Sequence, residues 1–242
     1  MRLLHRPPRL QTGVELGILN GGSGSSGPEP FRLWARLNGK AQVKLVAITG
    51  GIASGKSSVL HGLAARMGAP WISCDDIVTR LYEQEPVLAA VRERFGEPIV
   101  TQGRLDRLAL GRAVFGDAGA RRWLEGFLHP LVLQAVEAWC VELAGQTPVS
   151  WGVVEVPLLY EVDFPLKRDI DMVVGCSLST QLKRIQSRDQ LDEEQALRRI
   201  GAQLPMEHKV IRADVVVWND GSKTVLQQLI GLAADRIQGI RS

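Results

Sequence analysis

The sequence predicts an α/β protein with a parallel sheet. Two observations predict this class. Short apolar, β-branched runs alternate with amphipathic segments of helical spacing from Lys44 onward, and the first of these runs ends in a glycine-rich loop. The length of 242 residues suits one domain with an insertion, or two small domains. The content of 45% hydrophobic and 23% charged residues excludes collagen-like, coiled-coil and wholly disordered chains.

The first elements alternate along the chain. Residues 44–49 form a short apolar run that predicts a buried strand, and residues 55–67 have the apolar spacing of a helix. Residues 70–73 are expected to form a second strand. Asp75 and Asp76 follow it in the first turn of a helix, where carboxylates interact favourably with the helix dipole.

A helical block then interrupts the alternation. Residues 86–147 contain no convincing strand and are interpreted as several helices inserted after the second strand, with Pro130 at a helix start or a kink. The alternation resumes afterwards, which indicates a return to the sheet. The elements expected there are strands at 149–156, 170–176 and 214–218 and helices at 178–188, 192–202 and 223–240.

The distribution of charge and cysteine narrows the class of protein. Residues 1–43 hold six basic and two acidic groups, a net charge of +4, so the total of +3 leaves −1 for residues 44–242. Nucleic acid is therefore not an expected partner. Cys74, Cys140 and Cys176 are far apart, which is typical of a reducing, cytoplasmic compartment. No apolar run approaches the roughly 18 residues of a membrane span, so no membrane association is expected.

The first 43 residues differ in composition from the rest of the chain. Residues 20–30 read NGGSGSSGPEP, a flexible stretch that cannot build a core, so residues 1–43 are expected to be a disordered N-terminal extension. Non-native sequence from an upstream start codon, with translation beginning near Val43, is a second interpretation. The Arg-rich, acid-poor character leaves a targeting segment as a third.

The glycine-rich loop is the strongest functional signal. Residues 50–57, GGIASGKS, match the pattern G-x-x-x-x-G-K-[ST] at every fixed position, between an apolar strand and a helix. The glycines let backbone N–H groups turn toward phosphate oxygens, and the N-terminus of the helix favours anions. We expect Lys56 to contact the β- and γ-phosphates and the Ser57 hydroxyl to bind Mg²⁺. The loop predicts binding of a nucleoside triphosphate without defining the reaction.

Three further features bear on the reaction. Asp75 lies at the carboxyl edge of the predicted sheet, where it is placed to accept the proton of a substrate hydroxyl; an exposed helix-capping acid is the alternative. Arg184 and Arg188 are four residues apart and share a helix face, which favours a mobile lid; a solvated face is the alternative. Glu155 ends a strand, either to hold a metal-bound water or simply as a polar strand end.

A series of short segments runs in a fixed order along residues 44–230. The segments are TGGIASGKSS at 49–58, ISCDDI at 72–77, LDR at 105–107, VF at 114–115, LHP at 128–130, PLLYE at 157–161, QLKRIQSRD at 181–189, RRIGAQLP at 198–205 and ADVVVWNDGS at 213–222. In this order they resemble the dephospho-coenzyme A kinase family, which catalyses the last step of coenzyme A biosynthesis. The resemblance covers nearly the whole chain after the N-terminal extension.

The resemblance implies a three-layer P-loop kinase fold with a parallel sheet. Its nucleotide-binding core would comprise residues 44–85 and 148–242, including a helical lid at about 181–205, and residues 86–147 would form a helical CoA-binding insert. The resemblance implies ATP as the phosphoryl donor, with Mg²⁺, and the ribose 3′-hydroxyl of dephospho-CoA as the acceptor. A monomer or weak homo-oligomer is expected.

The resemblance also assigns roles to individual residues. The catalytic residues that it implies are Lys56, Asp75, Arg184 and Arg188, and the implied metal ligand is Ser57. The residues that it implies for nucleotide binding are Gly51, Ala53, Ser54, Gly55, Lys56, Ser57, Ser58, Asn219 and Gly221. The residues that it implies for acceptor binding are Asp75, Arg107, His129, Pro157, Leu158 and Glu161.

Two positions depart from the family pattern. Ala53 stands where the family's loop usually has glycine, and Ser73 stands where the family's D-A-D motif has its first carboxylate. An active enzyme is still expected, because the other reactive residues are present. The residues alone leave two further functions open: another small-molecule or nucleotide kinase, and a nucleotide-binding switch that phosphorylates no small molecule.

Overall fold

The computed structural model describes residues 43–146, 150–162 and 164–240, so the predicted extension lies outside the described residues except for Val43. Within them, five parallel strands form one sheet in the order β2-β5-β1-β6-β7. The strands are β1 (Lys44–Gly50), β2 (Trp71–Ser73), β5 (Trp151–Glu155), β6 (Ile170–Gly175) and β7 (Val215–Trp218). The predicted α/β class with a parallel sheet is therefore confirmed.

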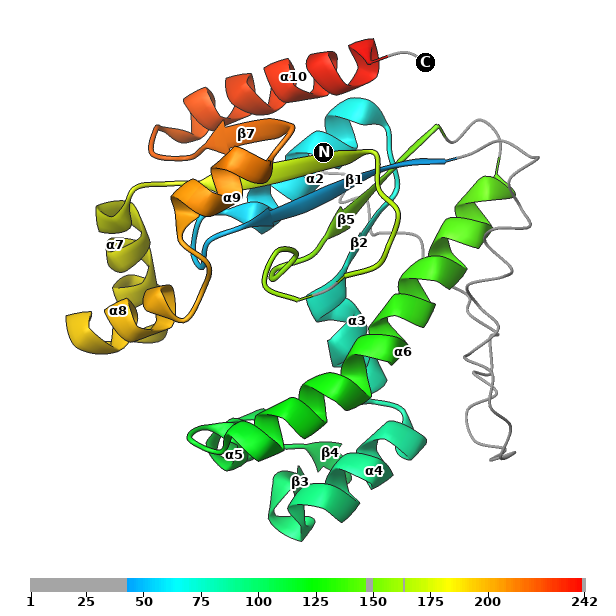
Figure 1. Ribbon diagram of the computed structural model, residues 1–242, viewed down its shortest axis with the longest axis vertical. Helices are drawn as coiled ribbons and strands as arrows, with labels where there is room; N and C mark the ends of the chain where they lie inside the picture. Colours follow the sequence, from blue (N-terminus) through cyan, green and yellow to red (C-terminus); the bar gives the residue numbers. More distant parts are fainter. Residues whose placement is uncertain (1–42, 147–149, 163, 241–242) are drawn as a thin grey trace, which may run out of the picture.

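The central strand β1 has apolar layers on both faces. Alternate side chains of a strand point to opposite faces, so β1 contributes to two cores. Leu45 and Ala47 belong to a buried cluster with helix α6 (Ala118–Ala144), whereas Val46 and Ile48 belong to a cluster with α2 (Lys56–Met67) and α10 (Lys223–Gly239). Helices therefore cover both faces of the sheet and form the outer two of three layers (Figure 1).

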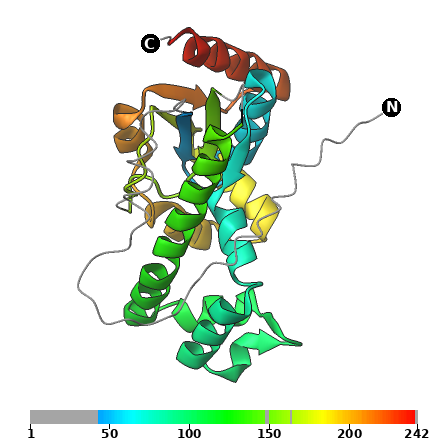
Figure 2. The same cartoon turned by 90° about the vertical axis from the view of Figure 1, so that its right-hand side faces the viewer.

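A group of helices lies at one end of the molecule (Figure 2). In it, α4 (Glu85–Phe95) and α5 (Arg107–Val114) lie away from the sheet, and α3 (Cys74–Leu81) and α6 connect them back to it. The expectation of no strand in this block is wrong, because β3 (Val100–Thr101) and β4 (Arg104–Leu105) pair as an antiparallel hairpin. Gln102 and Gly103 form its turn with positive φ, as the tightest hairpins require. Strands of two residues are too short to show alternation.

Helix α6 bears on two expectations. It runs through Pro130 without ending, so this proline marks no helix start; its missing N–H leaves a carbonyl of the preceding turn without its helical donor. Among the described residues, α6 is also the one helix long and apolar enough to cross a membrane by length and composition alone. The core helix of a soluble protein passes the same test, and Val136 and Trp139 of α6 are buried in the core with Leu45.

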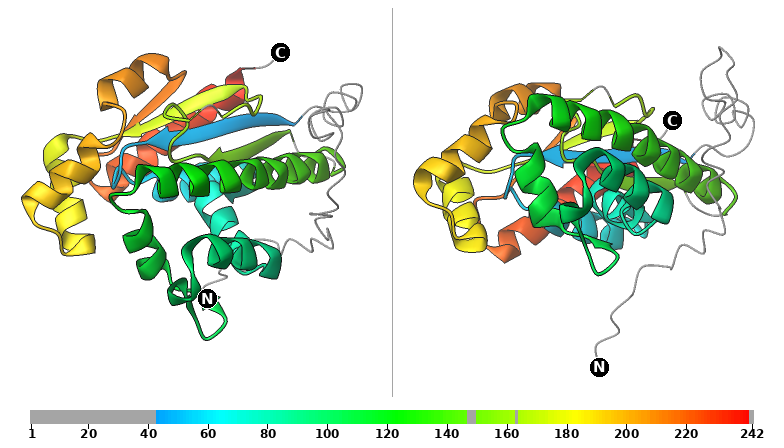
Figure 3. Two further views of the ribbon diagram at one scale, coloured as in Figure 1. Left: turned by 60° about the horizontal axis from the view of Figure 1, so that its bottom comes forward. Right: turned by 90° about the horizontal axis from the view of Figure 1, so that it is seen from below.

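The predicted lid contains two helices that lie beyond the carboxyl end of β1 (Figures 1 and 3). They are α7 (Leu178–Asp189) and α8 (Glu193–Gly201), within a residue of the predicted bounds. The side chain of Asp192 accepts a hydrogen bond from the backbone N–H of Gln195, and the side chain of Gln195 accepts one from the backbone N–H of Asp192. This capping box explains where α8 begins. A third helix, α9 (Met206–Arg212), follows the lid and was not predicted.

Candidate active site

The glycine-rich loop joins β1 to α2 at the carboxyl edge of the sheet, the edge where open α/β sheets bind ligands. Two of its glycines are required by close approach. A Cβ on Gly50 would lie 2.1 Å from the carbonyl oxygen of Val174 on β6. Gly55 precedes α2 with φ 95°, and a Cβ there would lie 2.3 Å from Asn219 Nδ2. The tight turn places the N-terminus of α2 at this edge, where it favours a phosphate.

Lys56 lies over the loop that precedes it. Its Nζ donates hydrogen bonds to the carbonyl oxygens of Gly50 at 3.3 Å and Gly51 at 3.0 Å. Burial lowers the pKa of Lys56, whereas the negative charges of Glu155 and Asp75 act in the opposite direction. The ammonium group is therefore placed between the loop and two carboxylates, Glu155 at the end of β5 and Asp75 in the helix that follows β2.

Glu155 is buried at the end of β5, with its Oε1 3.5 Å from the hydroxyl oxygen of Ser57. Burial raises the pKa of Glu155, and the charge of Lys56 lowers it. Ser73, on the neighbouring strand β2, pairs with Glu155 in the sheet register. A carboxylate at position 73, as in the family pattern, would bring a second negative charge beside Glu155 and raise that pKa further.

The oxygens of Ser57 and Glu155 fit a hard cation such as Mg²⁺. In the part of the chain that the structure describes, no group of three His, Cys, Asp or Glu side chains is arranged to hold a metal ion. Mg²⁺ bound beside a nucleotide usually takes one or two protein ligands together with the phosphates.

Asp75 lies in the first turn of α3, two residues after β2 ends. Its side chain is exposed, yet the groups around it displace enough water to raise its pKa. The positive charges of Lys56 and Arg107 lower that pKa, and the adjacent Asp76 raises it. Asp75 is therefore placed near Lys56 from the first part of the chain and near Arg107 from the helical block.

The two lid arginines occupy different positions. Arg184 Nη1 lies 3.2 Å and 3.3 Å from the carbonyl oxygens of Ala53 and Ser54, and its Nη2 donates to the carbonyl oxygen of Asn219 at 2.9 Å. Arg184 thus supports the backbone of the loop. Arg188 is exposed and pairs with the adjacent Asp189 at 2.7 Å and 2.9 Å.

Asn219 also holds the loop, beside Arg184. It is buried after β7, and its Nδ2 donates to the carbonyl oxygen of Ser54 at 2.8 Å. The backbone N–H of Asn219 donates to the carbonyl oxygen of Gly175 at 2.7 Å, which fixes its position at the end of β6. The structure therefore places Asn219 against the predicted nucleotide loop, whereas Gly221, two residues later, is exposed.

The segment after β5 is tied to the end of the lid by a buried ion pair. Glu161 Oε1 accepts hydrogen bonds from the Leu204 backbone at 3.1 Å and lies 2.5 Å from Lys209 Nζ. The side chain of Lys209 is 0% exposed. Earlier in the same segment, the carbonyl oxygen of Pro157 accepts a hydrogen bond from Thr49 Oγ1 at 3.2 Å, and Leu158 is exposed.

Some predicted site residues make no side-chain hydrogen bond or ion pair with the others among the described residues. Ser58 and His129 are exposed, and among the described residues neither makes a side-chain hydrogen bond or ion pair with another predicted site residue. Two contacting residues were missed. Gln203 accepts a hydrogen bond from the backbone N–H of Ile52 at 2.7 Å; it lies in the quoted segment RRIGAQLP, which was the available signal. Lys209 gave no signal, because a lysine near a helix end is usually solvated.

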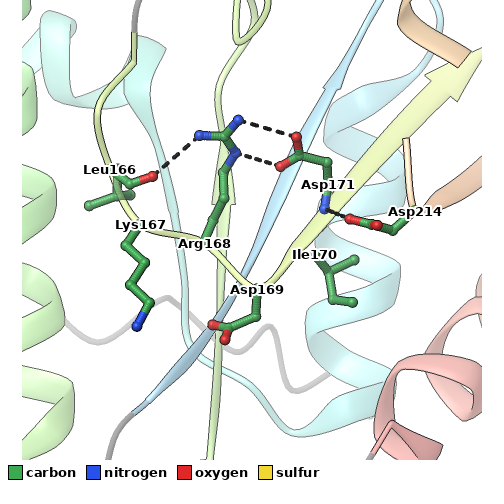
Figure 4. Close-up of a pocket in the computed structure, with 7 residues that line it drawn as sticks. All are labelled: Leu166, Lys167, Arg168, Asp169, Ile170, Asp171 and Asp214. Carbon is green, nitrogen blue, oxygen red and sulfur yellow. Dashed lines mark hydrogen bonds and ion pairs between the residues drawn. The ribbon is translucent and has the colours of Figure 1, made fainter. Parts of the chain in front are cut away.

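A hollow of about 290 Å³ lies at the opposite edge of the sheet (Figure 4). It is lined by Leu166, Lys167, Arg168, Asp169, Ile170, Asp171 and Asp214. Figure 4 shows Arg168 paired with Asp171, at 2.5 Å and 3.2 Å, and Asp214 accepting a hydrogen bond from the Asp171 backbone at 2.8 Å. Ile170 begins β6, so this hollow faces the amino ends of the strands and is separate from the glycine-rich loop.

Comparisons with known proteins agree on one family. The family model described as dephospho-CoA kinase matches residues 44–224. A dephospho-CoA kinase of Anaeromyxobacter dehalogenans is 40% identical over 187 residues, which cover 76% of this chain and 87% of that protein. A dephospho-CoA kinase of Parasynechococcus marenigrum is 38% identical over 194 residues, which cover 78% and 96%.

Two solved structures match over most of the chain. A Thermus thermophilus protein matches with a TM-score of 0.67 at 30% identity, covering 83% of this chain and 100% of that one. The dephospho-CoA kinase from Campylobacter jejuni matches with a TM-score of 0.56 at 26% identity, covering 81% and 98%.

Proposed function

This chain belongs to the dephospho-CoA kinase family and is a kinase that phosphorylates dephospho-CoA in the last step of coenzyme A synthesis, and we propose how its residues carry out that reaction. The family implies ATP as the co-substrate. Membership decides against the two alternatives that the residues left open, a kinase for another acceptor and a switch without a small-molecule substrate. The ribose 3′-hydroxyl is the proposed acceptor group.

On the nucleotide side, the backbone of the loop and the N-terminus of α2 bind the phosphates. Gly51, Ala53, Ser54, Gly55 and Ser58 contribute to this site as members of the loop or of the first turn of α2. Asn219 positions the loop through Ser54, and the exposed Gly221 lies in the segment proposed to approach adenine. Lys56 leaves its two carbonyl partners and binds the β- and γ-phosphates. Its ammonium group thereby exchanges weak, neutral acceptors for charged ones.

Mg²⁺ would be held by the hydroxyl of Ser57, with the buried carboxylate of Glu155 behind it. The ion would neutralise charge on the phosphates as the phosphoryl group moves.

On the acceptor side, the carboxylate of Asp75 orients the ribose 3′-hydroxyl and accepts its proton. Lys56 lies close enough for its charge to act on Asp75, so the attacking oxygen and the γ-phosphate are brought to one place. Arg188 is proposed to leave Asp189 and bind the transferring phosphoryl group as the lid closes, while Arg184 keeps the loop in place.

The rest of dephospho-CoA is proposed to lie along residues 86–147 and the segment after β5. Arg107, His129, Pro157, Leu158 and Glu161 are the proposed contacts. Arg107 and Leu158 are exposed toward solvent and need no rearrangement to be reached. We keep the predicted division into core, lid and insert, a monomer or weak homo-oligomer, and a cytoplasmic location as parts of this proposal.

The observation that carries the mechanism is the position of Asp75 after β2, within electrostatic reach of Lys56 and Arg107. The test is a coupled assay of ADP release with Mg·ATP, with and without dephospho-CoA, and mass analysis of the product. We expect Asp75→Asn to lower turnover about 100- to 10,000-fold without unfolding the protein. Asp76→Asn is the matched control and should retain most turnover. Full turnover by Asp75→Asn would contradict the assignment.

A further inference from the structure

We propose that Gln181 and Gln203 are positioning residues that hold the glycine-rich loop in its phosphate-binding conformation, and that this chain depends on them because Ala53 replaces a loop glycine. The proposal rests on nucleotide binding by the loop but not on the identity of the acceptor. The two glutamines come from opposite ends of the lid. Gln181 lies in the first turn of α7, and Gln203 lies between α8 and α9.

The two side chains bind the same loop residue from both sides. The backbone N–H of Ile52 donates to Gln203 Oε1 at 2.7 Å, and Gln181 Nε2 donates to the carbonyl oxygen of Ile52 at 2.9 Å. Gln181 is only 5% exposed, although it is a polar side chain. Its Nε2 lies so near the loop that a Cβ on Gly51 would be 2.4 Å away. These contacts are therefore built into the fold rather than formed at a mobile surface.

The bonds hold the part of the loop that is least favourable for its sequence. Ala53 has φ 57°, in the left-handed region that an alanine side chain disfavours. Gln203 holds the peptide group before Ile52, Gln181 holds the peptide group between Ile52 and Ala53, and Arg184 Nη1 holds the next one through the carbonyl oxygen of Ala53 at 3.2 Å. Three successive peptide groups are thus fixed by side chains from the lid.

The consequence is a link between lid position and nucleotide affinity. A glycine at position 53 would adopt the left-handed conformation without support. With alanine there, a loop released by the lid would relax toward conformations that bind phosphate less well. A movement of the lid that breaks these hydrogen bonds should therefore weaken nucleotide binding in this chain more than in a version with glycine at position 53.

The test is equilibrium binding of a non-hydrolysable ATP analogue with Mg²⁺ and no acceptor, so a wrong acceptor assignment leaves the result unchanged. Gln203→Met and Gln181→Met keep the side-chain length and remove the hydrogen bonds. Each should raise the Kd about tenfold, because a partly buried backbone group of Ile52 loses its partner. Adding Ala53→Gly to either variant should recover most of that loss. Gln186→Met, on α7 outside these contacts, is the control and should bind as the native protein does.

Three outcomes would overturn the proposal or a part of it. Folded Gln203→Met and Gln181→Met proteins with native affinity would show that the contacts do not position the loop. Tighter binding would show that the amides compete with phosphate. If either single variant fails to fold, the double variants with Ala53→Gly are compared with Ala53→Gly alone. The loss of affinity there should be at most about twofold, since glycine needs little support; an undiminished tenfold loss would refute the role of Ala53.

Discussion

The nucleotide side and the acceptor side of this site are held in different ways. On the nucleotide side, lid side chains and Asn219 bond directly to three successive residues of the loop backbone, 52–54, at distances from 2.7 Å to 3.3 Å. On the acceptor side, Asp75 and Arg107 are exposed, and in the described chain the side chain of Asp75 interacts with Arg107 and with Lys56 through charge rather than through hydrogen bonds.

The difference indicates which side is preorganised. The phosphate-binding loop has its partners before any substrate binds, so changes there should affect nucleotide affinity and stability together. The acceptor side is completed by the substrate and by movement of the lid, so changes there should affect turnover with little effect on stability. Lys56 lies between the two sides, and it gives the sharpest test of this comparison.

Of the changes considered, Lys56→Met should have the largest effect on turnover, because Lys56 lies between the nucleotide side and the acceptor side. We expect turnover to fall about 100- to 1,000-fold, because the charge that stabilises the transferring phosphoryl group is lost. The melting temperature should stay the same or rise, because burial lowers the pKa of Lys56 and so makes its charged form costly in the fold. Assays of turnover and thermal unfolding on the same sample measure both effects. A large drop in melting temperature would show that Lys56 is mainly structural.

The buried pair of Glu161 and Lys209 tests whether part of the acceptor side contributes to the stability of the fold, as the loop does. Lys209→Met leaves the Glu161 charge buried without its partner, which should cost about 3–5 kcal/mol of unfolding free energy. Adding Glu161→Gln should recover much of this loss. The exposed pair of Glu194 and Arg198 is the control, and Arg198→Met should cost at most about 1 kcal/mol. Urea titrations compare the four proteins; equal costs for both pairs would contradict the argument.

The pH dependence of turnover should report the acceptor side. The loss of surrounding water raises the pKa of both the exposed Asp75 and the buried Glu155, and each must be ionised for its proposed role. Turnover should therefore fall as the pH drops, beginning at a higher pH than an ordinary carboxyl group would give. Because the charge of Asp76 raises both pKa values, Asp76→Asn should move this acid limb to lower pH by less than about one unit. Asp235→Asn, on α10, is the control and should leave the acid limb where it is. A shift of the acid limb to higher pH in Asp76→Asn would contradict the assignment of this limb to Asp75 and Glu155.

The same comparison explains what the sequence can predict. The loop, the sheet strands and the lid helices were predicted because each depends on local spacing, a cap or a glycine. Asp75 was placed correctly at the sheet edge for the same reason. The contact between Gln203 and Ile52 and the buried position of Lys209 were not predicted, because they join segments more than 40 residues apart. Arg184 was expected to be a catalytic residue of the lid, and only the structure shows that its guanidinium group binds the loop backbone.

Ala53→Gly should give the smallest effect and the most specific one. Relief of the left-handed strain favours the variant, and the greater freedom of glycine in the unfolded chain opposes it, so the unfolding free energy should rise by at most about 1 kcal/mol. Ala202→Gly is the matched control, because Ala202 is an exposed lid alanine with φ −76°. There the entropy term acts alone, and stability should fall by about 0.5–1 kcal/mol. Opposite signs in the two urea titrations would attribute the gain to the backbone conformation of Ala53, whereas a loss in both would show that the lid contacts already remove the strain.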